Sequence, residues 1–349
     1  MNPIRQEDFI QSVADALQFI SYYHPADFVR AMTAAYDREQ SPAAKDAIAQ
    51  ILINSRMAAQ GRRPICQDTG YAIVMLKVGM NVRWDAQLSI QQMCDEAVRR
   101  AYTFKDNVLR ASMLDDPAGR RINTRDNAPA VVHVELVPGD TLEVFVGAKG
   151  GGSDNKSKVA MLLPGDDVVD WVVKTVATLG SGWCPPGVLS LGIGGSPEKA
   201  AMLAKWGLMQ PVDMAELLAR GPRDRVEELR VTLYEKVNAL GIGAQGLGGL
   251  TTVLDVKVAD VAAHAASKPV ALLPNCAATR HAHFVLDGSG PAALDPPADD
   301  LWPALTLDHA GSRRVNLDTL TPAEVATWKS GDRLLLSGKL LTGRDAAHK

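Results

Sequence analysis

Three cysteines in turn-forming segments constrain this chain more than any other feature. Cys66 begins the run Cys-Gln-Asp-Thr-Gly, Cys184 precedes two prolines and a glycine, and Cys276 lies in the run Asn-Cys-Ala-Ala-Thr-Arg. Thiolates are soft ligands that favour iron-sulfur clusters, zinc or copper(I). These cysteines stand too far apart along the chain for a zinc finger or a ferredoxin motif, so only the fold can bring them together. Our central prediction is that Cys66, Cys184 and Cys276 hold one iron-sulfur cluster.

The fourth cysteine, Cys94, has a different sequence context. Residues 88–104 carry apolar side chains at helical spacing, and Cys94 lies on their apolar face. A cysteine in such a stripe acts as a small packed hydrophobe. We therefore leave Cys94 out of the predicted ligand set.

Composition limits the classes of function. The chain has 349 residues, 46% of them hydrophobic, and a formal net charge of -3. It can bury a substantial core, and it has no overall basic charge to attract nucleic acid. Four cysteines are too few for a disulfide scaffold. The first residues are acidic where a signal peptide would be basic, and no apolar run could cross a bilayer, so we expect a cytoplasmic protein.

Apolar periodicity predicts a mixed α/β (α+β) fold, with a large cluster-binding domain of mixed sheets and surrounding helices. An apolar strand is expected at 71–78, and residues 130–137 and 141–146 have the pattern of paired strands across a Pro-Gly-Asp turn. Helices are expected at residues 4–23, after Pro25, and at 42–61, 88–104, 166–179 and 223–240.

The composition changes near residue 285, where Pro, Gly, Ala and Asp become frequent. We expect residues 1–285 to form the cluster-binding and catalytic domain and residues 286–312 to form a linker. Residues 313–349 have the pattern of two short strands and a helix, which is too little for an independent core. We therefore expect them to be the incomplete beginning of a second domain.

Two glycine-rich runs could each bind a ligand, and the sequence supports this for only one of them. Residues 241–246 match the dinucleotide-binding pattern G-x-G-x-x-G, but they follow a predicted helix and precede a strand, which is the reverse of the required order. We reject a dinucleotide site there. The run Lys-Gly-Gly-Gly at 149–152 exposes backbone N–H groups that could bind an anion, and it could equally be a flexible exit from a hairpin.

Residues near Cys66 indicate a type of chemistry. A cubane with three protein ligands leaves one iron open as a Lewis acid, which suits reversible dehydration of a hydroxy acid. Asp68 could donate or accept the proton, and Gln67 could bind a carboxylate. His264 lies among small residues and could be either a buried, satisfied histidine or a catalytic one.

Six motifs in order along the chain resemble class I, iron-sulfur-dependent fumarate hydratase. The resemblance covers nearly the whole chain, and the ordered set is far more specific than any one motif. The motifs are Cys-Gln-Asp-Thr-Gly at 66–70, Asn-x-Leu-Arg ending at Arg110, Lys-Gly-Gly-Gly-Ser at 149–153, Cys-Pro-Pro at 184–186, Gly-Ala-Gln-Gly at 243–246 and Gly-Arg-Asp-Ala-Ala-His at 343–348.

This resemblance implies a homodimeric enzyme that interconverts fumarate and malate with a [4Fe-4S] cluster. It also implies a cluster domain joined to a swivelling β/β/α domain, of which this chain would contain only the start. The residues it implies are Cys66, Cys184 and Cys276 as cluster ligands, Asp68 and His264 as catalytic residues, and Gln67, Arg110, Gly151 and Arg344 as substrate contacts.

Three alternatives stay open at the level of sequence. A related hydro-lyase could act on tartrate or mesaconate. Cys276 with His281 and His283 could form a zinc site, because cysteine and histidine together also suit zinc. A binding module could capture a dicarboxylate with its glycine-rich loops and basic residues without turnover.

Overall fold

The computed structural model describes residues 2–306 and 309–341. The chain divides between Ala304 and Leu305 into two compact units. Both units combine helices and strands, which confirms the mixed α+β class. The domain and linker boundaries expected at 285 and 312 stay predictions.

The first unit contains two four-stranded sheets. In the first sheet, the strand order is β12-β7-β2-β6. β2 pairs in parallel with β6 and antiparallel with β7. The strands are β2 (Tyr71–Gly79), β6 (Val131–Val137), β7 (Leu142–Lys149) and β12 (His281–Leu286).

The hairpin expected between residues 130–137 and 141–146 is wrong, because β2 lies between these two strands. The connecting turn instead closes over the end of β2: Gly79 N donates to Thr141 O, and Asn81 N donates to Gly139 O, both at 2.9 Å. A Cβ on Gly79 would lie 2.6 Å from the Gly139 carbonyl oxygen, so only glycine permits this approach. Alternating polarity shows which face of a strand is buried and does not name its neighbour, which is why the sequence misled us.

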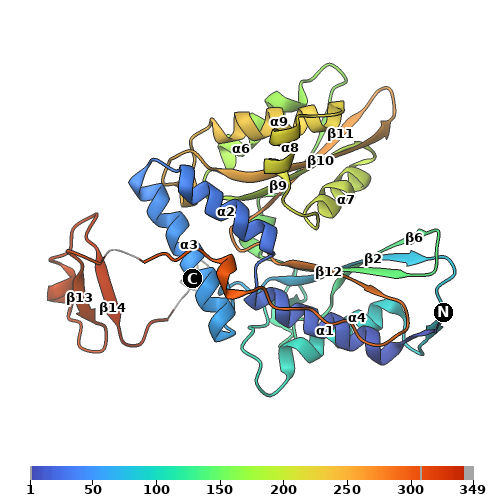
Figure 1. Ribbon diagram of the computed structural model, residues 1–349, viewed down its shortest axis with the longest axis horizontal. Helices are drawn as coiled ribbons and strands as arrows, with labels where there is room; N and C mark the ends of the chain where they lie inside the picture. The colour runs from blue at the N-terminus through green and yellow to red at the C-terminus, as the bar shows by residue number, and fades with distance from the viewer. Residues whose placement is uncertain (1, 307–308, 342–349) are drawn as a thin grey trace. The chain divides into compact units, whose positions relative to one another are not determined.

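Helices α1 (Gln6–Tyr22) and α4 (Ile90–Thr103) cover one face of the first sheet (Figure 1). Ser89 caps the start of α4 with a capping box, in which Ser89 and Gln92 satisfy each other's backbone N–H groups. Cys94 is fully buried in the core between these helices and the sheet. Its predicted packing role is confirmed.

The second sheet has the order β10-β9-β11-β8. Helices α6 and α9 pack on one face, and α7 packs on the other. The elements are β8 (Lys158–Leu162), β9 (Gly187–Gly195), β10 (Val253–Ala263), β11 (Lys268–Asn275), α6 (Val168–Leu179), α7 (Pro197–Gly207) and α9 (Arg225–Asn238).

Helix α7 joins the two sheets, and Figure 1 shows it in the space between them. Ala200 and Ala204 pack on the second sheet, and Trp206 packs edge-on against Phe145 of the first at 5.3 Å between ring centroids. A Cβ on Gly192 would lie 1.9 Å from the Ala200 carbonyl oxygen. Glycine at this position therefore lets α7 approach β9 closely.

Further helices and strands complete the first unit. They are β1 (Ile4–Arg5), α2 (Ala26–Arg38), α3 (Pro42–Gly61), β3 (Trp84–Asp85), β4 (Leu114–Asp115), β5 (Ile122–Asn123), α5 (Gly151–Asp154), α8 (Met214–Arg220), η1 (Ala244–Gly246) and η2 (Asp299–Leu301).

The second unit contains β13 (Arg313–Asn316), α10 (Pro322–Val325) and β14 (Leu334–Ser337). The two strands pair in parallel across the short helix, so the expected strand-helix-strand order is confirmed. Within the described ranges of the chain, no helix combines the length and the apolar character needed to cross a bilayer.

Candidate active site

The three cysteines predicted as ligands line one cavity of about 550 Å³. Cys66 precedes β2 of the first sheet, Cys184 precedes β9, and Cys276 follows β11 of the second sheet. β9 and β11 are antiparallel neighbours, so the start of one meets the end of the other. Ala277 N donates to Cys184 O at 3.0 Å and fixes the two cysteine loops together.

The cavity wall contains two non-glycine residues in the left-handed region, Cys184 with φ 58° and Gln245 with φ 53°. Such conformations are unfavourable for residues with a Cβ and persist only where the surroundings impose them. Here Gln245 donates both its backbone N–H and its side-chain amide to the Pro185 carbonyl, each at 2.7 Å. These bonds hold the Cys184 loop in one conformation.

A buried histidine supports the Cys276 loop from behind. His24 Nε2 lies 3.0 Å from Ala277 O, which can only accept, so Nε2 carries the hydrogen. Nδ1 then accepts from the Ser55 hydroxyl at 2.8 Å, and Ser55 in turn accepts from Trp302 Nε1 at 2.8 Å. Burial lowers the pKa of His24 to about 4, so the ring is neutral near pH 7.

The residues predicted to contact substrate are connected to the Cys66 loop by hydrogen bonds. Asp68 Oδ1 accepts from Gly70 N at 3.0 Å, and Oδ2 accepts from Gly151 N at 2.8 Å. Arg110 Nη2 donates to Gln67 O at 3.1 Å. The fold thus brings together Gln67, Asp68, Arg110 and Gly151, which come from three separate segments.

The glycine run at 150–152 packs against Asp68. A Cβ on Gly150 would lie 3.2 Å from Asp68 Oδ2, which is tighter than ordinary contact. Gly151 starts the short helix α5, and its N–H is already directed at the Asp68 carboxylate. The glycine run is therefore bound to a carboxylate of the chain itself, and anion binding by this run stays a prediction.

Two predicted site residues are not placed with the cysteine cavity or the Cys66 loop beside it. His264 is exposed in the turn between β10 and β11, and Cys276 follows the opposite end of β11. β11 has 8 residues, and a strand of this length spans about 26 Å at ~3.3 Å per residue. Arg344 lies outside the described residues. The roles of His264 and Arg344 stay predictions.

The histidines of the alternative zinc site face elsewhere. His281 and His283 line a separate cavity with Glu143, and His283 stacks on Phe145 with 4.2 Å between ring centroids. Across residues 2–306 and 309–341, no three His, Cys, Asp or Glu side chains are placed to hold a single metal ion. A cubane takes each thiolate on a different iron, so its ligands stand further apart than those of one ion. Three thiols around one cavity fit the cluster better.

Sequence reasoning did not assign a buried role to three polar residues around this site. Lys149 is buried, donates to Ser153, and has its pKa lowered to about 8 by burial. Arg280 is 2% exposed. An arginine four positions after a predicted ligand, in a run of small residues, was a usable signal, whereas nothing in the sequence around His24 marks its role.

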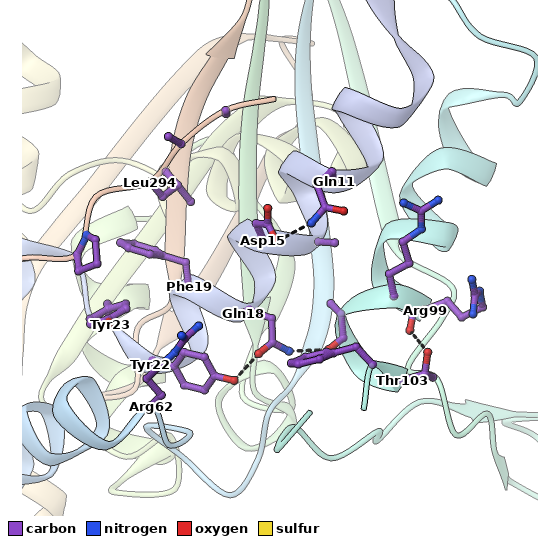
Figure 2. Close-up of a pocket in the computed structure, with 17 residues that line it drawn as sticks. Gln11, Asp15, Gln18, Phe19, Tyr22, Tyr23, Arg62, Arg99, Thr103 and Leu294 are labelled. Carbon is purple, nitrogen blue, oxygen red and sulfur yellow. Dashed lines mark hydrogen bonds between the residues drawn. The ribbon is translucent and has the colours of Figure 1, made fainter. Parts of the chain in front are cut away.

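A larger cavity of about 880 Å³ lies between α1, the end of α4 and residues 292–296. Figure 2 shows its polar groups bonded to one another: Gln18 accepts from the Tyr22 hydroxyl and donates to Ala101 O, and Gln11 donates to Asp15. None of the predicted site residues lines it.

The sequence also matches known proteins over most of its length. Residues 10–285 match the family model described as fumarate hydratase (Fumerase), and residues 288–349 match the one described as fumarase C-terminus.

Three relatives illustrate the similarity. A protein of Methanocaldococcus jannaschii that carries the name of L(+)-tartrate dehydratase subunit alpha is 34% identical over 77% of this chain and 94% of its own length. The anaerobic class I fumarate hydratase of Escherichia coli is 30% identical over 93% of this chain. The match spans 61% of that enzyme's length. An L(+)-tartrate dehydratase subunit alpha of Escherichia coli is 31% identical over 77% of this chain and 87% of its own length. Taken with the two family matches, these similarities show that the chain belongs to the class I fumarate hydratase family.

Proposed function

We propose that this protein is a hydro-lyase that reversibly adds water to a small unsaturated dicarboxylate, with fumarate and (S)-malate as the substrate pair. One observation carries the proposal: three cysteines line a single cavity, and Cys66 and Gln67 in its wall adjoin Asp68. The names of the relatives, fumarate hydratase and tartrate dehydratase, describe the same class of reaction.

The proposed cofactor is a [4Fe-4S] cluster held by Cys66, Cys184 and Cys276. When bound, such a cluster supplies an iron without a protein ligand, which acts as a Lewis acid towards a hydroxyl group. The donor set fits, because thiolates are the preferred protein ligands of these clusters. Burial raises the pKa of the Cys66 thiol, while Arg280 opposes this effect and favours the thiolate.

The chain's own residues would bind and orient the substrate. Arg110 supplies a guanidinium, and Gln67 supplies a side-chain amide, both on the exposed edge of the Cys66 loop. These groups suit the carboxylates of a dicarboxylate. Gly151 would allow the substrate to approach the backbone closely, since it has no side chain.

Asp68 is the proposed proton-transfer residue. Hydration forms a C–O bond from water to one alkene carbon and a C–H bond at the other, and dehydration reverses both changes. Two backbone N–H groups fix the Asp68 carboxylate, one on each oxygen. A carboxylate held in this way can accept or donate a proton at one oxygen without first reorienting.

Tartrate dehydration is the second candidate, and it is favoured by the match to 94% of the length of the M. jannaschii relative. Fumarate is favoured because the match to the class I fumarate hydratase covers 93% of this chain and so includes residues beyond 285. Mesaconate hydration is a third possibility within the same reaction class.

The proposal also includes two residues that the structure does not place at the site, because His264 lies elsewhere and Arg344 lies outside the described residues. His264 would act in catalysis, and Arg344 would bind a substrate carboxylate. The protein would be a cytoplasmic homodimer, without nucleic-acid or membrane partners.

Anaerobic reconstitution with iron and sulfide tests the proposal. The expected product is brown, with broad absorbance near ~400 nm, about four irons per chain and a colour that fades in air. Assays of the full-length protein with fumarate, tartrate and mesaconate then identify the substrate. A colourless protein that retains zinc, or one that binds a dicarboxylate equally well without metal and never turns it over, would contradict the proposal.

A further inference from the structure

The residue that the proposed chemistry leaves unexplained is Arg280. It lies four positions after Cys276, in the segment that connects β11 to β12, and it is 2% exposed. Its guanidinium lies next to Gly150, which also packs against Asp68 of the Cys66 loop. A Cβ on Gly150 would lie 3.5 Å from Arg280 Nη2 and 3.2 Å from Asp68 Oδ2. Arg280 therefore lies between the two halves of the site.

Two of the three guanidinium nitrogens of Arg280 are buried without a hydrogen-bond partner within the part of the chain that the structure describes. Its Nε and Nη1 atoms are buried and have no hydrogen-bond partner there. No carboxylate of the described residues forms an ion pair with it either. Burial of a cation without an acceptor is strongly unfavourable, so such a group normally serves an anion that the chain does not itself provide.

Arg230 shows how this chain treats a buried arginine with a purely structural role. Arg230 is 8% exposed, and its guanidinium donates to the Val256 carbonyl and to the carboxylates of Asp213 and Asp255. Two carboxylates and a carbonyl thus compensate its burial. Arg280 has comparable burial, and no carboxylate or carbonyl of residues 2–306 and 309–341 bonds to its guanidinium.

The surroundings of Arg280 indicate which anion it serves. A second buried cation, Lys149, lines the same small cavity as Arg280, together with Asn275, which immediately precedes Cys276. His24, behind the Cys276 loop, is neutral. The buried positive charge is therefore concentrated on the side of the thiols.

We infer that Arg280 directs its unpartnered N–H groups at the anionic thiolate-sulfide assembly built on Cys66, Cys184 and Cys276, and thereby stabilises it. This inference rests on the proposed function, because it requires that assembly to form. Hydrogen bonds and positive charge next to a cluster stabilise it and raise its reduction potential.

The test compares Arg280→Met and Arg280→Lys with wild type, and uses Arg230→Met as the control for loss of a buried arginine. After anaerobic reconstitution, we expect Arg280→Met to lose absorbance near ~400 nm about tenfold faster than wild type in the presence of a chelator. Its midpoint potential should shift to a more negative value. Arg280→Lys should lie between the two, and Arg230→Met should retain the lifetime and potential of wild type.

Thermal unfolding of the metal-free proteins separates this role from a structural one. Arg280→Met should unfold at or above the wild-type temperature, because it removes an uncompensated buried charge, whereas Arg230→Met should unfold at a lower temperature. A metal-free Arg280→Met that is as destabilised as Arg230→Met would overturn the inference.

Three other results discriminate further. An Arg280→Met cluster with wild-type lifetime and potential would overturn the inference. A raised KM with an unchanged cluster would do the same and would assign Arg280 to the substrate carboxylate. Wild-type protein that takes up no cluster would contradict the proposed function itself.

Discussion

Two cavities of the first unit differ in a way that favours one of them as the proposed site. The larger, of about 880 Å³, is lined by polar groups that already bond to one another, such as Gln18 with Tyr22. The smaller, of about 550 Å³, is lined by three cysteines, and a buried arginine with two unpartnered donors follows Cys276 by four residues. Volume alone would favour the first cavity. Uncompensated polar chemistry favours the second, because groups that are left unsatisfied in the protein are available to a ligand.

The largest expected effect is on cofactor binding. Cys184→Ser should abolish stable cluster assembly, since it removes one of the three proposed ligands, whereas Cys94→Ser should leave iron content unchanged because Cys94 is packed in the core. Iron and sulfide determination after anaerobic reconstitution measures both. Equal iron content in the two variants would contradict the assignment of Cys184, and not Cys94, as a cluster ligand.

The next effect is on catalysis. Asp68→Asn preserves the shape of the side chain but removes its capacity to exchange a proton, so turnover should fall by about 10²-fold or more. The cluster absorbance should stay at the wild-type level. Wild-type turnover by this variant in the full-length protein would show that Asp68 only anchors the glycine run.

A smaller effect concerns the pH dependence of stability. The pKa of His24 is lowered to about 4 in the folded protein from its ordinary value of 6.5, mainly by burial. Between these values the unfolded chain takes up a proton that the folded protein does not, so the stability is full above pH 6.5 and falls as the pH decreases towards 4.

Denaturant titrations of the metal-free proteins measure this dependence. Between pH 7 and pH 4.5, wild type should lose about 2 kcal/mol more of its unfolding free energy than His24→Gln does. His264→Gln serves as the control for the loss of an exposed imidazole. Parallel pH profiles for wild type and His24→Gln would mean that the ring is not kept neutral by burial.

The smallest effect is expected in the larger cavity. Gln18→Ala removes the acceptor of the Tyr22 hydroxyl and the donor to Ala101 O, and should lower the unfolding free energy by about 1 kcal/mol. Cluster content should not change, because no cysteine lines this cavity. Loss of the cluster in Gln18→Ala would break the comparison between the two cavities.

Local patterns in the sequence predicted most of the elements. Apolar spacing located α1, α3 and α6 within a few residues, and it separated Cys94 from the other cysteines. The expected order of helix and strand around residues 241–246 is confirmed, since the structure places this run between α9 and β10. Such features depend on residues close together in the chain, which is why they could be predicted.

Features that depend on distant segments were not predictable in the same way. The pairing of β6 with β2 instead of β7 follows from packing that involves four separated strands. A series of hydrogen bonds joins four distant positions, Trp302, Ser55, His24 and Ala277. No local sequence pattern predicts it.

The sequence by itself determined which atoms are available for chemistry: three thiols in turns, a carboxylate two positions from one of them, and glycines that allow backbone contact. The tertiary structure decided which of these atoms meet. It brought Gly151 to Asp68 and the Cys276 loop to the Cys184 loop, and it buried Arg280 beside them. The reason is physical: residue types set chemical reactivity, whereas proximity between distant segments is set by the packing of sheets and helices as a whole.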